Sequence, residues 1–174
     1  MYPFLPNPVG PSHYQPHHRF AMKKTLLLVA ASIFVITGFT VLDYNSDRQA
    51  DREAVNAAVL DYVEAIYQVE PERIEKSVDP TLRKVGYWYN DGQTEYTEME
   101  MNYQQLYDLA SSWNQSGRVP HDSQKDIEIY DVLDKTATAK LTASWGIDYM
   151  QLAKKDGAWK IMNIVWQRHP PGSN

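Results

Sequence analysis

Asp148 and His121 are the side chains of this sequence best suited to moving a proton. A carboxylate serves as a general base, and a histidine exchanges a proton near neutral pH. Asp148 lies in an alternating segment that predicts a strand, and His121 lies in a predicted loop between Pro120 and Asp122. Each also has an ordinary structural interpretation, as an aspartate beside a tight turn and as a surface histidine. Both remain candidate bases, with the structural alternative open.

The aromatic side chains of residues 43–174 all carry a polar group. This part holds ten tyrosines and five tryptophans but no phenylalanine, because all four phenylalanines lie in the first 42 residues. Every buried ring then needs a hydrogen-bond partner for its O–H or N–H group. One interpretation is that the rings fill the core and bond to backbone and water. The other is a pocket for a flat, polar small molecule, lined by Tyr62, Trp88, Tyr107, Trp113, Trp145, Tyr149 and Trp166.

The composition excludes several kinds of chemistry. The absence of cysteine excludes disulfides, thiolate catalysis and cysteine-ligated zinc. No His, Asp or Glu cluster has the spacing of a metal site, and there is no Gly-rich phosphate loop, so we expect neither a metal nor a cofactor. Residues 43–174 carry 14 basic and 22 acidic side chains, a net charge of −8, so this part would repel nucleic acid.

The first half of the predicted domain, residues 43–168, contains three helices and two strands. Residues 82–90 and 94–100 alternate around a turn at 90–92 and predict two strands, the polar second one at a sheet edge. A short helix is predicted from Pro71 to Val78, and a third helix from Asn102 to Gly117. The first helix is indicated by apolar residues on one face, namely Val55, Ala58, Val59, Tyr62, Ile66 and Val69.

Four more strands follow, which gives the order ααββαββββ. They are predicted at residues 127–133, 137–145, 147–153 and 158–168, with turns at 134–135 and 156–157. The last strand is apolar on both faces and should lie in the centre of its sheet. Because three helices cover only one face of that sheet, we expect a second copy of the chain to cover the other, as a homodimer. Residues 169–174 are expected to end the chain as a tail.

The first 42 residues predict an export segment. Lys23 and Lys24 precede an uncharged apolar run at 25–42, which fits either a cleaved signal peptide or a retained membrane anchor at 22–42. Since the lysines precede this run and all acidic residues follow it, the domain should lie outside the cytoplasm. It is then either periplasmic or tethered to the outer side of the inner membrane, with residues 25–42 as its only membrane contact. Residues 1–21, rich in proline and histidine, are expected to be disordered, or untranslated if synthesis starts at Met22.

Three stretches of this sequence resemble a known family. They are Asp79-Pro-Thr-Leu-Arg-Lys-Val-Gly-Tyr, Met101-Asn-Tyr-Gln-Gln-Leu-Tyr-Asp-Leu-Ala, and Ala139-Lys-Leu-Thr-Ala-Ser-Trp-Gly-Ile-Asp-Tyr-Met-Gln-Leu with the following Lys155-Asp-Gly-Ala-Trp. They resemble the putative lumazine-binding family of the nuclear transport factor 2-like superfamily over roughly residues 50–167. The resemblance implies an α+β, cone-shaped fold in which a curved, mostly antiparallel sheet packs on a long N-terminal helix.

The resemblance leaves the function open. Enzymes of this superfamily use a pocket carboxylate as base with a phenol as oxyanion donor, which directs attention to Asp148 and Tyr149. Adjacent strand residues point to opposite faces, so this pair needs a bulge at Gly146 to share one pocket. We expect an exported, non-enzymatic domain that binds a small aromatic or polar-heterocyclic ligand or serves as a scaffold. The alternative is a cofactor-independent lyase or isomerase with Asp148 or His121 as base.

Overall fold

The computed structural model of this protein describes residues 46–172. The predicted segments 1–21 and 22–42 lie outside the described residues. Within residues 46–172, no helix has both the length and the apolar character needed to cross a membrane.

A long helix, described over residues 46–68, forms the support on which the sheet packs. Val55, Val59, Tyr62 and Ile66 repeat at helical spacing and are at most 2% exposed, so one stripe of this helix faces the core. Removing each such side chain from water stabilises the fold by about 1.5–3 kcal/mol.

Two shorter helices follow. Helix α2 (Glu72–Ser77) contacts α3, β1 and β6, and helix α3 (Tyr103–Ser112) contacts β1 and β2. Asn102 caps α3: its side chain accepts a hydrogen bond from the Gln105 backbone, and the Gln105 side chain accepts one from the Asn102 backbone. This reciprocal pair fixes where the chain turns from strand into helix.

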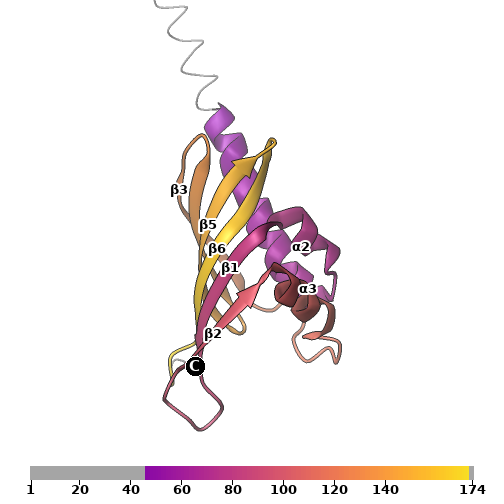
Figure 1. Ribbon diagram of the computed structural model, residues 1–174, viewed down its shortest axis with the longest axis vertical. Helices are drawn as coiled ribbons and strands as arrows, with labels where there is room; N and C mark the ends of the chain where they lie inside the picture. Colours follow the sequence, from indigo (N-terminus) through magenta and orange to yellow (C-terminus); the bar gives the residue numbers. More distant parts are fainter. Residues whose placement is uncertain (1–45, 173–174) are drawn as a thin grey trace, which may run out of the picture. The chain divides into compact units, whose positions relative to one another are not determined.

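One six-stranded sheet curves around the long helix, with the helices on one side of it (Figure 1). The strand order is β2-β1-β6-β5-β4-β3; β1 and β6 are parallel and all other pairs are antiparallel. The strands are β1 (Val78–Trp88), β2 (Thr97–Asn102), β3 (Lys125–Val132), β4 (Thr136–Ala143), β5 (Gly146–Lys155) and β6 (Ala158–Arg168). The predicted α+β class and the order ααββαββββ are confirmed, with the polar β2 at an edge and β6 inside the sheet.

Strand β6 contains a bulge that the sequence pattern did not predict. Ile161 pairs with Leu152 and Asn163 pairs with Gln151, so Met162 is an extra residue without a partner on β5. A bulge moves all following side chains to the other face. Trp159 and Ile161 before it therefore share the helix side with Ile164 and Trp166 after it, and the predicted division of β6 into two alternating apolar faces was wrong.

The buried aromatic rings have partners for their polar groups. The Tyr67 hydroxyl donates to the Gln124 carbonyl at 2.7 Å and accepts from the Ser144 backbone at 2.8 Å, and the Trp159 ring N–H donates to Asp51 at 3.0 Å. Over residues 46–172, no buried side-chain nitrogen or oxygen lacks a hydrogen-bond partner. The core interpretation of the aromatic residues therefore holds for Tyr67 and Trp159.

Candidate functional site

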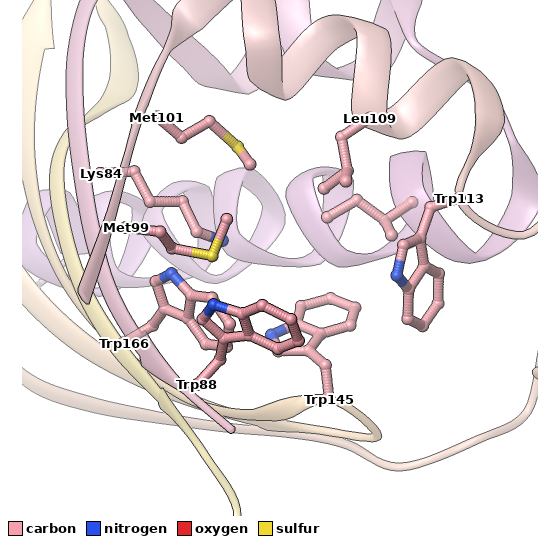
Figure 2. Close-up of a pocket in the computed structure, with 9 residues that line it drawn as sticks. Lys84, Trp88, Met99, Met101, Leu109, Trp113, Trp145 and Trp166 are labelled. Carbon is pink, nitrogen blue, oxygen red and sulfur yellow. The ribbon is translucent and has the colours of Figure 1, made fainter. Parts of the chain in front are cut away.

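A cavity of about 230 Å³ lies between the sheet, the long helix and α3 (Figure 2). Four of the five tryptophans form much of its wall: Trp88, Trp113, Trp145 and Trp166. Ile66, Met99, Met101 and Leu109 complete the apolar lining. Lys84 is the one lining residue with a charged side chain.

Strand and turn geometry places three of these tryptophans. Trp88 ends β1, and Trp166 lies directly opposite Gly86 in the parallel β1–β6 pair. A Cβ at position 86 would lie 1.8 Å from the Trp166 ring nitrogen, so Gly86 provides the space that this ring occupies. Trp145 lies in the two-residue turn between β4 and β5.

Trp145 is held by contacts on several sides. Its ring nitrogen donates to Asp148 Oδ2 at 2.7 Å. Its ring also makes edge contacts with Tyr62, Tyr67 and Trp113, with centroids 5.4–6.2 Å apart. Such contacts are favourable beyond simple burial and fix the orientation of the ring. The cavity wall is therefore rigid at this point.

Lys84 brings an ammonium group to an otherwise apolar wall (Figure 2). Its side chain is 5% exposed, and its Nζ lies 5.2 Å from the ring centroids of both Tyr62 and Trp166. Such a cation above aromatic faces is stabilised by the negative potential of the rings. Nζ donates to the Tyr62 hydroxyl at 2.5 Å and lies 3.4 Å from Asp148 Oδ1.

Burial dominates the electrostatics of this cluster. Burial lowers the pKa of Lys84, and the Asp148 carboxylate opposes this effect. Burial and then the Asp148 charge raise the pKa of Tyr62 well above its ordinary value, so this phenol stays protonated. The two hydrogen bonds of Lys84 use two of its three N–H groups, and no third acceptor is within reach among residues 46–172.

The structure separates Asp148 from Tyr149. Asp148 is fully buried on the helix side of β5, whereas Tyr149 is 51% exposed on the opposite face. The β4–β5 and β5–β6 registers run without a shift from Gly146 to Tyr149, so the bulge needed to bring the pair together is absent there. Tyr149 therefore does not line the cavity, and it cannot act with Asp148 on one ligand.

Asp148 holds two of the lining side chains through its carboxylate. Both of its oxygens are engaged, one by the Trp145 ring N–H and the other by Lys84. It does not line the cavity, because Lys84 and Trp145 lie in front of it. Its position suits fixing these two side chains and does not suit taking a proton from a ligand.

The other predicted site residues lie at different places. Tyr62 is fully buried and does not line the cavity, but its hydroxyl and its ring contact the lining residues Lys84 and Trp145. Tyr107 is a half-buried residue of α3 that packs on the core and does not line the cavity. His121 is exposed in its loop, where its carbonyl accepts a hydrogen bond from Lys125. Neither Tyr107 nor His121 lines this cavity.

Lys84 is the charged site residue that the sequence analysis missed, beside the apolar Ile66, Met99, Met101 and Leu109. Its signal lies in the alternation of β1, which places Leu82, Lys84, Gly86 and Trp88 on one face. A lysine between a core leucine and an aromatic residue, on the face that packs inward, is unusual because a buried charge needs compensation. For metal binding, no group of three or more His, Asp or Glu side chains within the described part is placed to hold an ion.

The fold and site define a class of protein. A curved sheet wrapped around a long helix, with a cavity between them, is the cone-like arrangement of nuclear transport factor 2-like domains, and solved structures support this assignment. Proteins of this class and of unknown function from Silicibacter pomeroyi and Methylobacillus flagellatus are 15% and 23% identical, with TM-scores of 0.53 and 0.51. They cover 72% and 69% of this chain, and the match spans 98% and 93% of their own chains.

A third structure, a nuclear transport factor 2-like protein with a cystatin-like fold from Novosphingobium aromaticivorans, is 12% identical with a TM-score of 0.53. The match covers 77% of this chain and 92% of that one. At such identities these likenesses show the fold alone. The profile of the putative lumazine-binding family matches residues 50–167, and the chain belongs to this family. No curated protein matches the sequence at a significant level.

Proposed function

We propose that this domain binds a small, flat, polar heterocycle in the tryptophan cavity. The observation that carries the proposal is Lys84, whose Nζ lies in an otherwise apolar wall of aromatic rings with one N–H group unused by the described residues. A ring stacked on the tryptophans would satisfy this N–H with a carbonyl oxygen or ring nitrogen at its edge. Membership of the putative lumazine-binding family supports a ligand of this chemistry.

The shape and composition of the cavity favour a compact ring. The cavity volume of about 230 Å³ is below the range of typical sites for drug-sized ligands, which is about 300–1,000 Å³. Met99 and Met101 from the edge strand β2 lie above the tryptophans (Figure 2). Methionine side chains adapt to the shape of a partner, so this side of the cavity can adjust to the outline of the ring.

The test is a titration of the purified protein with lumazine, followed by quenching of tryptophan fluorescence and checked by native mass spectrometry. We expect saturable quenching, because four of the five tryptophans line the cavity. Replacing Lys84 by methionine, which keeps the length of the side chain, should weaken binding roughly 10- to 100-fold, since a hydrogen bond to a charged group contributes about 1.5–3 kcal/mol.

The matched control is Lys140→Met on the other face of the sheet, where Lys140 pairs with Glu128. This variant should bind lumazine as the unaltered protein does. The double variant Lys84→Met/Asp148→Asn keeps the pocket free of an unpaired buried charge, so its loss of affinity reports on the ligand contact and not on the fold. Absence of saturable binding, or equal binding by the Lys84 variants, would contradict the proposal.

A scaffold role for the domain is less well supported by this geometry. A scaffold needs no cavity, whereas here the aromatic side chains surround one. For lyase or isomerase chemistry, none of the bases expected from the sequence reaches the cavity, because Asp148 is shielded, Tyr149 lies on the opposite face and His121 is exposed in its loop. Binding without turnover therefore accounts best for the contacts of the described residues.

We further propose that the domain works outside the cytoplasm, on the support of the sequence alone. Lys23 and Lys24 precede the apolar run at 25–42, and every acidic residue follows it. Fusing alkaline phosphatase, which is active only after export, to the C-terminus should give active enzyme in cells. An inactive fusion, together with a fluorescent cytoplasmic fusion, would overturn this placement.

A further inference from the structure

A second, wider chamber opens beside the tryptophan cavity. It encloses about 530 Å³ and shares all four tryptophans with the cavity. Its other walls come from the ends of β1 and β6, the loop after α3 and the C-terminal segment. The polar side chains that line it are Tyr89, Arg118, Ser144, Arg168 and His169.

The charge of this chamber is opposite to that of the domain. Two arginines and a histidine line it, and no carboxylate does. Residues 43–174 carry 22 acidic and 14 basic side chains, so a surface chosen at random would be acidic. A locally basic hollow on an acidic domain attracts and concentrates anions there.

The two arginines differ in how they are held. Arg168 donates to the Tyr89 carbonyl at 2.6 Å and to Asp91 at 2.5 Å, and its guanidinium lies 4.7 Å above the Tyr89 ring. Asp91 is 91% exposed, so water screens its charge. Arg118 is exposed and forms no hydrogen bond or ion pair with any described residue. No described residue uses any of its five N–H donors.

The backbone on either side of the chamber is firmly positioned. The buried Asn114 side chain donates to the Tyr67 and Val119 carbonyls and accepts from the Val119 backbone, which fixes the loop that carries Arg118. His169 bonds through Nε2 to the Ala143 carbonyl at 2.8 Å, and its own carbonyl accepts from Tyr89 at 2.6 Å. From the segment that was expected to form a tail, His169, Pro170 and Gly172 thus line the chamber.

We propose that this chamber holds a short anionic arm, a carboxylate or a phosphate, attached to the ring that occupies the tryptophan cavity. The inference rests on the proposed function, since the ring must enter first. The same four tryptophans line both spaces, so a ring stacked on them in the cavity can direct a short substituent toward the chamber. Guanidinium groups bind carboxylates and phosphates through paired hydrogen bonds, and the donors of Arg118 are not used by residues 46–172.

The experiment compares two matched pairs of probes by tryptophan fluorescence quenching: lumazine with 6-carboxylumazine, and riboflavin with flavin mononucleotide. The members of each pair differ only by the anionic group. We expect the anionic member of at least one pair to bind about tenfold more tightly at low salt, and this advantage to shrink at high salt because charges near the surface are screened. Arg118→Gln should remove the advantage and leave binding of the neutral member unchanged.

Arg83→Gln is the matched control, because Arg83 is also exposed but pairs with Glu100 on the opposite face of the sheet. This variant should keep the full preference for the anionic probes. Equal affinity within both pairs, or a preference that survives in Arg118→Gln, overturns the anionic arm while ring binding stands. Failure of all four probes to bind overturns both proposals.

Discussion

Lys84 and Asp148 form a buried ion pair whose geometry is poor for stability. Their closest atoms are 3.4 Å apart, whereas charge-assisted hydrogen bonds usually measure about 2.7–2.9 Å. Desolvating two charges costs several kcal/mol per ion, and a long contact recovers little of it. An apolar pair would therefore suit the fold better, and the presence of a lysine here agrees better with a role in binding.

A double-mutant cycle tests this view. Lys84→Met leaves the Asp148 carboxylate buried without its cation, and Asp148→Asn leaves the Lys84 ammonium buried without its counter-charge. Each single variant should lose about 3–5 kcal/mol of unfolding free energy, and the double variant much less than the sum. Urea denaturation followed by circular dichroism measures all four proteins. Strictly additive losses would show that the pair does not interact.

At the scale of elements, β1 and β6 meet through a glycine and a tryptophan. Gly86 is the only described glycine without a positive φ, so its backbone conformation does not require glycine. Glycine is needed here because a side chain would collide with the Trp166 ring. Gly86→Ala should push the Trp166 ring from its place, destabilise the domain by about 1–3 kcal/mol and weaken lumazine binding.

Adding Trp166→Leu to Gly86→Ala makes room for the new methyl group. This second change should recover part of the lost stability, as measured by thermal unfolding, but not the ligand affinity, since Trp166 lines the cavity. An unaltered melting temperature for Gly86→Ala alone would mean that the sheet absorbs the added methyl group without strain.

Asp79 stabilises the start of β1 through hydrogen bonds and an ion pair. Its Oδ1 accepts from the Thr81 backbone at 2.9 Å and hydroxyl at 2.6 Å, and its Oδ2 accepts from Lys155 at 2.6 Å. Burial alone would raise the pKa of Asp79, but the hydrogen bonds from Lys155 and Thr81 outweigh it and lower the pKa to about 2 from an ordinary value of 3.8. These contacts lie at the start of β1, which begins at Val78, the residue at which the predicted helix was expected to end.

The lowered pKa makes a prediction about acid stability. Ionised Asp79 should contribute about 2 kcal/mol above pH 3.8, and this contribution should be lost as the pH falls through the folded-state pKa of about 2, below which Asp79 is protonated in both states. Asp79→Asn should thus differ from the unaltered protein near pH 6 and converge with it near pH 2 in urea denaturation. Asp126→Asn, at an exposed position, should show no such convergence. A constant difference across this range would contradict the assignment.

The order of helices and strands could be predicted because it depends on local periodicity, which the residues display directly. The turn at Asp156 and Gly157 is an example, since both adopt positive φ, as a tight hairpin requires. Features that depend on tertiary pairing could not be predicted. The bulge at Met162 is set by the register with β5, and the inward direction of Lys84 is recognisable only once the core face of β1 is known. The lining of the cavity depends on both features, because the bulge turns Trp166 toward the helix side and Lys84 points to the same side.

At the scale of the whole molecule, the outer face of the sheet carries apolar side chains without a described partner. Tyr130, Tyr149 and Val165 are 54%, 51% and 45% exposed and line one shallow hollow. Single exposed apolar residues are common on monomers, but a cluster on a sheet face is typical of an interface. The homodimer stays a prediction, and this cluster now supports it in place of the alternation of β6, which was wrong.

The dimer is tested on the intact chain by light scattering coupled to size exclusion. We expect a dimer that becomes monomeric in Tyr149→Glu, because a charge buried in the interface would lack a partner while the exposed position in the monomer tolerates it. Tyr96→Glu changes a tyrosine that is 40% exposed but outside the strands, and should remain dimeric. Ligand affinity should be equal in both variants, since the tryptophan cavity opens on the helix side of the sheet. A monomeric unaltered protein would show that this face meets a different partner or none.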